Sequence, residues 1–553
     1  MRQARILLSL LTAILLPGLV SVIRSQQPAP SPAPPHTEQM VPMRDGTKLA
    51  TDVYLPSGAG PFPVVLTRTP YGKGNMPAGA WVSQGYAFVS QDVRGKFKSE
   101  GIYRPFLDDA NDGHDTVEWI ARQPWSTGKV GMFGVSAMGI AANQAAMTAP
   151  PHLTAVFVML ARASVYSQSA FMGGVYRSEL NDEWLKREHA ESIITEQLKH
   201  NVYDHFFDDE EMSRHWGEVR VPAYNYGGWY DIFNQGNIDD FTGLQASGGG
   251  LAAGNQKLMM GPWGHGKLEE VKYPQNSTIN PTGEALRWFD YWLKGVNNHI
   301  MEEPPVKYYA MGDVTDPHAP GNEWETALSW PPPSRTTSYF LRAGGGLSLT
   351  MPSGSDGGDD KAASKDSYQY DPKNPVPTIG GGNLFAKKGP MDQRETGPRK
   401  DVLKYQTAPL DSPVEIAGRV RVELYGESDC PDTDFMAKLV DVYPDGTERL
   451  VLDSAIRARF HDGFDHEAFL KSGQVYKFNL DLWSTSLVFN KGHRIAIQVT
   501  SSNAPRFDPN PNTGKPPRAS DETRVATNSI HHDIVYPSRV LLPVVPLENG
   551  KHP

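Results

Sequence analysis

A serine, an aspartate and a histidine follow short apolar runs that end in small residues, and the serine gives the strongest signal. Ser136 lies in Gly131-Met132-Phe133-Gly134-Val135-Ser136-Ala137-Met138-Gly139, between an apolar run and a helical pattern. This arrangement is typical of a nucleophile elbow, because the serine backbone is strained and only small neighbours let its hydroxyl point outward. Gly134 and Gly139 would supply that room. The usual elbow is G-x-S-x-G, whereas Met138 holds the fifth position here, so the segment alone is equally typical of an ordinary strand-to-helix turn.

Asp231 and His265 supply the partners that an activated serine needs. Asp231 follows Tyr224–Tyr226 and a Gly-Gly-Trp-Tyr segment, and His265 follows Leu258–Met260 and Gly-Pro-Trp-Gly. The order Ser, Asp, His is that of α/β-hydrolases, and each residue comes just past a predicted strand, at the edge where open α/β sheets bind ligands. Singly, His265 is equally a surface histidine and Asp231 a helix N-cap. Together they predict a triad with Ser136 as nucleophile, His265 as base and Asp231 orienting the base.

The elements that would position these residues alternate between strand and helix. Runs at 64–67, 86–89 and 130–133 are β-rich, and residues 112–122 keep helical spacing. Strands that alternate with helices indicate a parallel sheet. The predicted fold class is therefore α/β, with the first part of an α/β-hydrolase domain at 38–163.

The remainder of this domain is predicted to follow an insertion. Residues 164–219 are rich in charge and aromatic side chains at helical spacing and give no strand signal, so we expect a helical cap there. The second part of the hydrolase domain, at 220–330, ends in a helix at 284–294 that Gly295 can terminate.

The C-terminal part of the sequence has a different hydrophobic pattern. Runs such as 420–424 and 494–499 alternate apolar and polar residues and are separated by turn residues. This pattern is typical of antiparallel strands with one buried face. Residues 331–553 are therefore predicted to form an all-β sandwich.

The N-terminus predicts export. Arg2 and Arg5 precede an apolar run at 6–23, which is typical of a signal peptide at 1–25, and a proline-rich linker follows at 26–37. We expect a periplasmic or secreted protein whose mature chain begins between 25 and 35. The alternative is an uncleaved membrane anchor, because the run approaches spanning length.

Composition narrows the partners. The chain has 53 basic and 63 acidic residues, for a net charge of −10, and no basic cluster of the kind that nucleic-acid binding requires. Its single cysteine, Cys430, excludes an intrachain disulfide and a CxxC metal knuckle. We expect a small-molecule ester or acyl substrate, no cofactor or metal, and no stable membrane partner unless the N-terminal segment is retained. The sequence leaves the oligomeric state open.

Six ordered segments carry a family resemblance. The chain resembles the cocaine-esterase-like (CocE/NonD) serine hydrolases, related to X-prolyl dipeptidyl aminopeptidases, α-amino-acid ester hydrolases and glutaryl-cephalosporin acylases. The segments are Thr69-Pro70-Tyr71-Gly72, Asp92-Val93-Arg94-Gly95, the Ser136 elbow, Gly228-Trp229-Tyr230-Asp231, Gly261-Pro262-Trp263-Gly264-His265 and Asp432-Thr433-Asp434-Phe435. The resemblance implies an α/β-hydrolase domain, a helical cap and a jelly-roll C-terminal domain. The longer elbow spacing is normal in this family, although tyrosine usually stands where this chain has Ala137.

The resemblance also implies an oxyanion hole made by the Tyr71 hydroxyl and the Ala137 N–H. Without it, Tyr71 would be a turn residue beside Pro70. Trp229, Phe233 and Phe435 are candidates for an apolar acyl pocket, and each is equally well suited to a structural core.

Three functions fit the sequence. The first is a carboxylic-ester hydrolase, the second an X-Pro dipeptidyl peptidase or β-lactam side-chain acylase, and the third a non-catalytic binding protein. The amino-acid ester hydrolases of the wider family bind a substrate ammonium with carboxylates near the elbow and after the triad aspartate. Here those segments are Ala137-Met138 and Ile232-Phe233-Asn234, without an acid. We therefore expect uncharged acyl groups to be preferred, unless Glu179 or Asp182 of the cap reaches the site.

Overall fold

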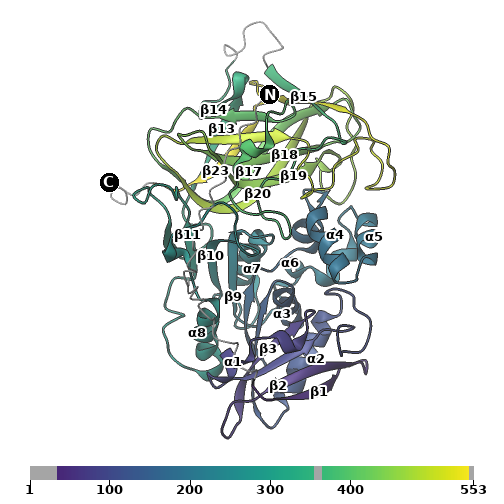
Figure 1. Ribbon diagram of the computed structural model, residues 1–553, viewed down its shortest axis with the longest axis vertical. Coiled ribbons are helices and arrows are strands. Elements are labelled where there is room, and N and C mark those ends of the chain that lie inside the picture. Colours follow the sequence, from purple (N-terminus) through teal and green to yellow (C-terminus); the bar gives the residue numbers. More distant parts are fainter. Residues whose placement is uncertain (1–33, 354–363, 547–553) are drawn as a thin grey trace, which may run out of the picture.

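The computed structural model describes residues 34–353 and 364–546. In Figure 1 a helix-covered sheet lies at one end of the long axis and a β-rich domain at the other. The helices α4 (Ser178–Arg187), α5 (Ser192–Lys199) and α6 (Met212–His215) lie between them, near the ends of the central strands.

The first domain is built on a 10-stranded sheet of order β1-β2-β4-β3-β5-β6-β9-β10-β11-β12. The strands from β4 to β11 are parallel to one another, which confirms the predicted parallel sheet. The outer strands β1, β2 and β12 are antiparallel. The bounds are β1 His36–Pro42, β2 Lys48–Tyr54, β3 Phe62–Thr69, β4 Ala87–Asp92, β5 Ser126–Val135, β6 Leu153–Met159, β9 Ala223–Tyr230, β10 Lys257–Gly264, β11 Val306–Ala310 and β12 Glu323–Ala327.

Helices cover both faces of this sheet. α2 (Asp109–Ala121), α3 (Ala137–Met147) and α7 (Asn234–Ser247) pack on one face, and α1 (Ala78–Val82) and α8 (Pro281–Lys294) pack on the other. The helices predicted at 112–122 and 284–294 are confirmed as α2 and α8. Gly295 ends α8 with φ 72°, a left-handed conformation that glycine adopts without steric cost.

The insertion between β6 and β9 is mostly helical, with one difference from the prediction. Besides α4, α5 and α6 it contains a two-stranded ribbon, β7 (Phe171–Met172) and β8 (Val175–Tyr176). Two-residue strands are too short to show alternation, so no pattern in the sequence could predict them. Gly173 and Gly174, both at positive φ, make the turn between them.

The C-terminal domain is an all-β sandwich, and the alternating runs at 420–424 and 494–499 are confirmed as parts of β17 and β21. The strands are β13 Arg335–Arg342, β14 Gly346–Ser348, β15 Lys365–Tyr370, β16 Leu403–Gln406, β17 Val414–Ser428, β18 Asp434–Val442, β19 Glu448–Arg457, β20 Tyr476–Phe489, β21 Arg494–Thr500, β22 Ala526–His531 and β23 Arg539–Val544. All except β20 follow one path of neighbouring strands, and β20 pairs with β17. At the start of β18 the fully buried Asp432 and Asp434 pair with Arg459 and Arg457, which gives this segment a structural role.

The two domains share a continuous core. Met311, just after β11, donates its N–H to the Ser486 carbonyl of β20 and accepts from the Val488 N–H. A single cluster of buried side chains runs from Trp229 and Tyr308 in the first domain to Leu480 in the second. The sandwich is thereby fixed against the edge of the hydrolase sheet where β9 ends.

The predicted signal peptide at 1–25 and most of the predicted linker at 26–37 lie outside the described residues. The last two residues of the predicted linker, His36 and Thr37, are described and belong to β1. Among the helices of residues 34–353 and 364–546, none has the length and apolar character to cross a bilayer.

Candidate active site

The turn between β5 and α3 places Ser136 in a strained backbone conformation. Ser136 has φ 58° and ψ −125°, a region that non-glycine residues rarely occupy. Its N–H donates to the Met159 carbonyl on the neighbouring strand, and its carbonyl accepts from Ile140 of α3, both at 2.9 Å. A Cβ on Gly134 would lie 2.1 Å from the Met138 carbonyl oxygen. The absence of that Cβ is what allows strand and helix to approach each other here.

Ser136, His265 and Asp231 form one hydrogen-bonded chain. His265 Nε2 lies 2.9 Å from Ser136 Oγ, and His265 Nδ1 lies 2.7 Å from Asp231 Oδ2. Because an ionised carboxylate only accepts, the proton of a neutral His265 is on Nδ1, and Nε2 is left to accept from the serine hydroxyl. This is the arrangement that a general base needs.

Asp231 is held rigidly in this chain. Its side chain is 1% exposed, and its second oxygen, Oδ1, accepts the Phe233 N–H at 2.7 Å. The Phe233 ring also lies edge-on to the His265 imidazole, with 6.2 Å between the ring centroids. Both contacts restrict the imidazole to one orientation.

Tyr71 lies on the loop after β3 and contacts Trp184, which lines the cavity described below. Its N–H donates to Thr69 Oγ1 at 3.0 Å, and its hydroxyl oxygen accepts from Trp184 Nε1 of α4 at 3.1 Å. Burial raises the pKa of Tyr71 to about 12, so the phenol is protonated at neutral pH. Ala137 is the first residue of α3, and an N–H at that position has no carbonyl one turn earlier to bind. The assignment of these two groups to an oxyanion hole therefore stays a prediction.

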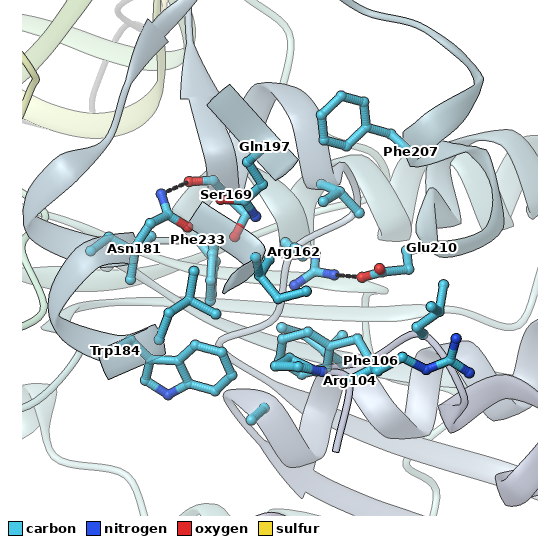
Figure 2. Close-up of a pocket in the computed structure, with 18 of the residues that line it drawn as sticks. Arg104, Phe106, Arg162, Ser169, Asn181, Trp184, Gln197, Phe207, Glu210 and Phe233 are labelled. Carbon is cyan, nitrogen blue, oxygen red and sulfur yellow. Dashed lines mark hydrogen bonds and ion pairs between the residues drawn. The ribbon is translucent and has the colours of Figure 1, made fainter. Parts of the chain in front are cut away.

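A cavity of about 140 Å³ opens beside Ser136 and Ala137. Figure 2 shows side chains from the cap and from the loop before α2 converging on it. Most of its wall is apolar, and its aromatic side chains are Phe106, Trp184, Phe206, Phe207 and Phe233. Phe106 and Trp184 stack with 5.5 Å between their centroids. This composition suits an apolar acyl or leaving group.

Of the three aromatic residues predicted for an acyl pocket, only Phe233 lines this cavity. Trp229 is 2% exposed, donates its Nε1–H to the Tyr309 carbonyl and packs on Trp330 in the core between the domains. Phe435 is fully buried in the sandwich, against Phe478. Every residue of β9 and β18 is buried, so side chains on either face of these strands pack in cores.

The two cap acids that could have bound a substrate ammonium, Glu179 and Asp182, form contacts with the C-terminal domain instead. Glu179 accepts the backbone N–H groups of Leu384, Phe385 and Ala386, from a loop of the C-terminal domain. Asp182 is paired with Arg518 of the same domain. Neither acid lines the cavity, and Glu179 instead holds the loop that brings Leu384 into its wall.

Sequence reasoning missed several residues of the site. Trp184 and Phe106 could have been suspected only as aromatic residues in a cap and a loop. Arg162 and Glu210 also line the cavity and pair with each other at 2.7 Å. Arg162 comes a few residues after the end of β6. Asp231 and His265 were predicted from the same kind of position after a strand, and this position could have indicated Arg162 too.

The Asp92-Val93-Arg94-Gly95 segment runs from the last residue of β4 into the loop after it. Arg94 binds Asp112 of α2 with two hydrogen bonds, of 3.0 and 2.6 Å, and also contacts Asp45 and Thr47. These contacts fix the loop after β4 against α2.

Comparison with known proteins agrees with this geometry. Two family models match: the X-Pro dipeptidyl-peptidase (S15 family) model at 45–191 and 178–267, and the X-Pro dipeptidyl-peptidase C-terminal non-catalytic domain model at 298–541. The cocaine esterase of Rhodococcus sp. (strain MB1 Bresler) is 34% identical, over 92% of this chain and 98% of its own length. The chain belongs to the cocaine-esterase-like family of serine hydrolases.

Solved structures extend the likeness of this cocaine-esterase-like chain to its whole fold. An α-amino acid ester hydrolase superimposes with a TM-score of 0.79 and 26% identity, over 96% of this chain and 100% of that one. An aminopeptidase from the marine sediment archaeon Thaumarchaeota archaeon has a TM-score of 0.79 at 24% identity, over 94% of this chain and 99% of that one. The latter likeness concerns the fold alone.

Proposed function

We propose that this serine hydrolase cleaves carboxylic esters through a covalent acyl-enzyme. The observation that carries the proposal is the hydrogen-bonded chain from Ser136 through His265 to Asp231, at 2.9 and 2.7 Å, beside a cavity with a largely apolar wall. A nucleophile, a base and an orienting carboxylate in hydrogen-bond contact are what acyl transfer requires.

In the first half of the cycle, Ser136 Oγ attacks the ester carbonyl while His265 Nε2 takes the hydroxyl proton. Asp231 stabilises the imidazolium that forms. The carbonyl oxygen becomes negative, and the Tyr71 hydroxyl and the Ala137 N–H donate to it. The tetrahedral intermediate then collapses, the C–O bond to the alcohol breaks, and His265 returns the proton to the departing oxygen.

In the second half, water replaces the alcohol. His265 Nε2 takes one proton from this water, and the oxygen attacks the acyl carbon with the same two donors on the oxyanion. Collapse breaks the bond to Ser136 Oγ and His265 protonates that oxygen. The products are a carboxylic acid and the free enzyme.

The alternative is cleavage of an X-Pro dipeptide, which the names of the two matching family models favour. Such a substrate brings a free α-ammonium into the site, and a buried ammonium needs a carboxylate partner. Glu179 and Asp182 are bound elsewhere. Of the two acids that line the cavity, Glu210 is paired with Arg162 and Glu196 with Lys199. The ester reading is therefore preferred.

The test is a substrate panel of phenyl acetate, Ala-Pro p-nitroanilide and an acylated β-lactam, assayed on the wild-type protein and on Ser136→Ala. We expect the wild type to hydrolyse the ester with the highest kcat/KM and Ser136→Ala to lose that activity. A higher kcat/KM on the anilide would assign the peptidase reaction instead. Failure of a fluorophosphonate probe to label the wild-type serine would remove the hydrolase proposal altogether.

We also propose that the protein acts outside the cytoplasm. Support comes from the sequence alone, from Arg2, Arg5 and the apolar run at 6–23.

A further inference from the structure

Arg162 brings a buried positive charge to the wall of an otherwise apolar cavity. Its side chain is 4% exposed, and its guanidinium lies over the Phe106 ring, with 4.4 Å from Cζ to the ring centroid. Figure 2 shows it between Phe106 and Glu210, whose carboxylate it contacts. The stack fixes the plane of the guanidinium.

The guanidinium is only partly satisfied. Nη2 donates to Glu210 Oε2 at 2.7 Å, and this is its one hydrogen bond to the described residues. Nε is buried without a partner, and Nη1 has no acceptor in the described part of the chain either. A buried donor without an acceptor is unfavourable, so such groups in native proteins are usually matched. An occupant of the cavity that carried an acceptor would supply the missing partner.

We propose that Arg162 binds an oxygen acceptor on the acyl group of the substrate, so that the cavity selects esters whose acyl chain carries a second carbonyl or carboxylate. This rests on the proposed ester hydrolysis and specifies its substrate class. Arg162 and Ser136 line the same cavity, so an acyl group bound to Ser136 extends along the wall that holds the guanidinium.

The charges around Arg162 favour an acceptor over an ammonium. A guanidinium only donates, and it repels a cation. Burial raises the pKa of Glu210 to about 7, although Arg162 lowers it and Asp109 raises it further. Another anion close by would raise this pKa further, which favours the neutral form of Glu210. Nearby Glu211 is bound to the Val165 N–H, and Asp109 to Arg68, so both acids are already engaged.

The experiment compares three p-nitrophenyl esters of similar acyl length. The 5-oxohexanoate carries a ketone, the 5-methylhexanoate replaces that oxygen by a methyl group, and the hemiglutarate carries a carboxylate. The measured quantity is the ratio of kcat/KM for each acceptor ester to that for the 5-methylhexanoate. We expect the wild-type protein to favour the 5-oxohexanoate by about tenfold, the effect of one hydrogen bond to a charged donor.

Two variants test whether the preference for acceptor esters depends on Arg162 and Glu210. Arg162→Met keeps the length of the side chain and removes the donors, so the ketone preference should fall to about one. Glu210→Gln keeps the shape of the partner and leaves the positive charge unbalanced, so the hemiglutarate ratio should rise by about tenfold or more. Arg287→Met is the control, because Arg287 of α8 pairs with Glu284 and Glu303, and none of these three residues lines the cavity.

Ratios that stay unchanged in folded Arg162→Met would overturn the proposal, and so would a wild-type ratio near one. If Arg162→Met does not fold, Glu210→Gln decides: an unchanged hemiglutarate ratio in this variant would overturn the proposal. Hydrolysis of p-nitrophenyl acetate distinguishes failure of the Arg162 proposal from failure of the proposed ester hydrolysis, because acetate has no second acceptor. If the acetate is cleaved in a Ser136-dependent way and the kcat/KM ratios are near one, only the Arg162 proposal is wrong. If no ester is cleaved, the proposed function itself is wrong.

Discussion

Trp184 of the cap donates its indole N–H to the hydroxyl oxygen of Tyr71, at 3.1 Å. Because that oxygen already accepts a hydrogen bond, the phenol proton is directed elsewhere, and the substrate oxyanion is the partner that the mechanism supplies. The contact also ties α4 to the loop after β3. The position of α4 and the orientation of the Tyr71 hydroxyl are therefore linked through these two side chains.

Tyr71→Phe should lower kcat by about tenfold to a thousandfold, up to ~4 kcal/mol in transition-state free energy, with a much smaller change in KM. The hydroxyl acts on a charge that exists only in the transition state, so ground-state binding is hardly affected. Steady-state kinetics on phenyl acetate measure the effect. An unchanged kcat would leave Tyr71 with a turn role alone.

Trp184→Phe should lower kcat by a smaller factor, about three- to tenfold, because it removes only the hydrogen bond that orients Tyr71. Phenylalanine keeps an aromatic ring to stack on Phe106. The decisive measurement is the double variant: in a Tyr71→Phe background, Trp184→Phe should have almost no further effect on kcat. Trp125→Phe, whose ring packs on Trp119 away from the cavity, is the matched control. Additive losses would contradict a positioning role for Trp184.

Asp231→Asn and His265→Ala should each remove most of the turnover that Ser136→Ala removes, because the three side chains act as one unit. We expect losses of about a thousandfold or more in kcat, with circular dichroism unchanged. Combining Asp231→Asn with Ser136→Ala should add little to Ser136→Ala alone. Near-wild-type kcat in either single variant would remove that residue from the mechanism.

Uncharged acyl groups should react faster than their α-amino counterparts. A buried ammonium without a carboxylate loses several kcal/mol of solvation, more than the roughly 1.5–3 kcal/mol gained by burying one apolar side chain. Glu179 and Asp182 are bound to the C-terminal domain, and Arg162 adds a positive charge to the wall.

The measurement compares phenylacetyl with phenylglycyl methyl ester at a pH where the amine is protonated. We expect phenylacetyl to lead by about tenfold or more in kcat/KM. The gap should narrow at a pH where the amine is neutral, since only the charged form pays the solvation penalty. A lead for phenylglycyl at low pH would show that an acid of the cavity, such as Glu210, accepts the ammonium.

The mature protein should begin between residues 25 and 35 and be recovered from the periplasm or the medium. The reason is the charged and apolar pattern of the first residues. Cell fractionation followed by N-terminal sequencing measures this. Met1 on a protein extracted only with detergent would instead indicate a retained anchor.

The local pattern of the chain was enough to predict that three distant residues would meet, and they form one hydrogen-bonded chain in the structure. Ser136, Asp231 and His265 each follow a strand, and parallel strands of one sheet end at one edge, so the order of the residues already implied their convergence. The same local rules predicted α2, α8 and the alternating strands of the sandwich, because periodicity and end signals act within a few residues.

Tertiary structure alone decided what surrounds the triad. Trp229 and Phe435 lie in cores because other elements cover both faces of β9 and β18. A loop of the C-terminal domain, held by Glu179, brought Leu384 to the cavity. The pairing of Arg162 with Glu210 joins residues from opposite ends of the inserted cap. Such contacts depend on how separate elements pack, and periodicity along the chain carries no information about which distant side chains meet.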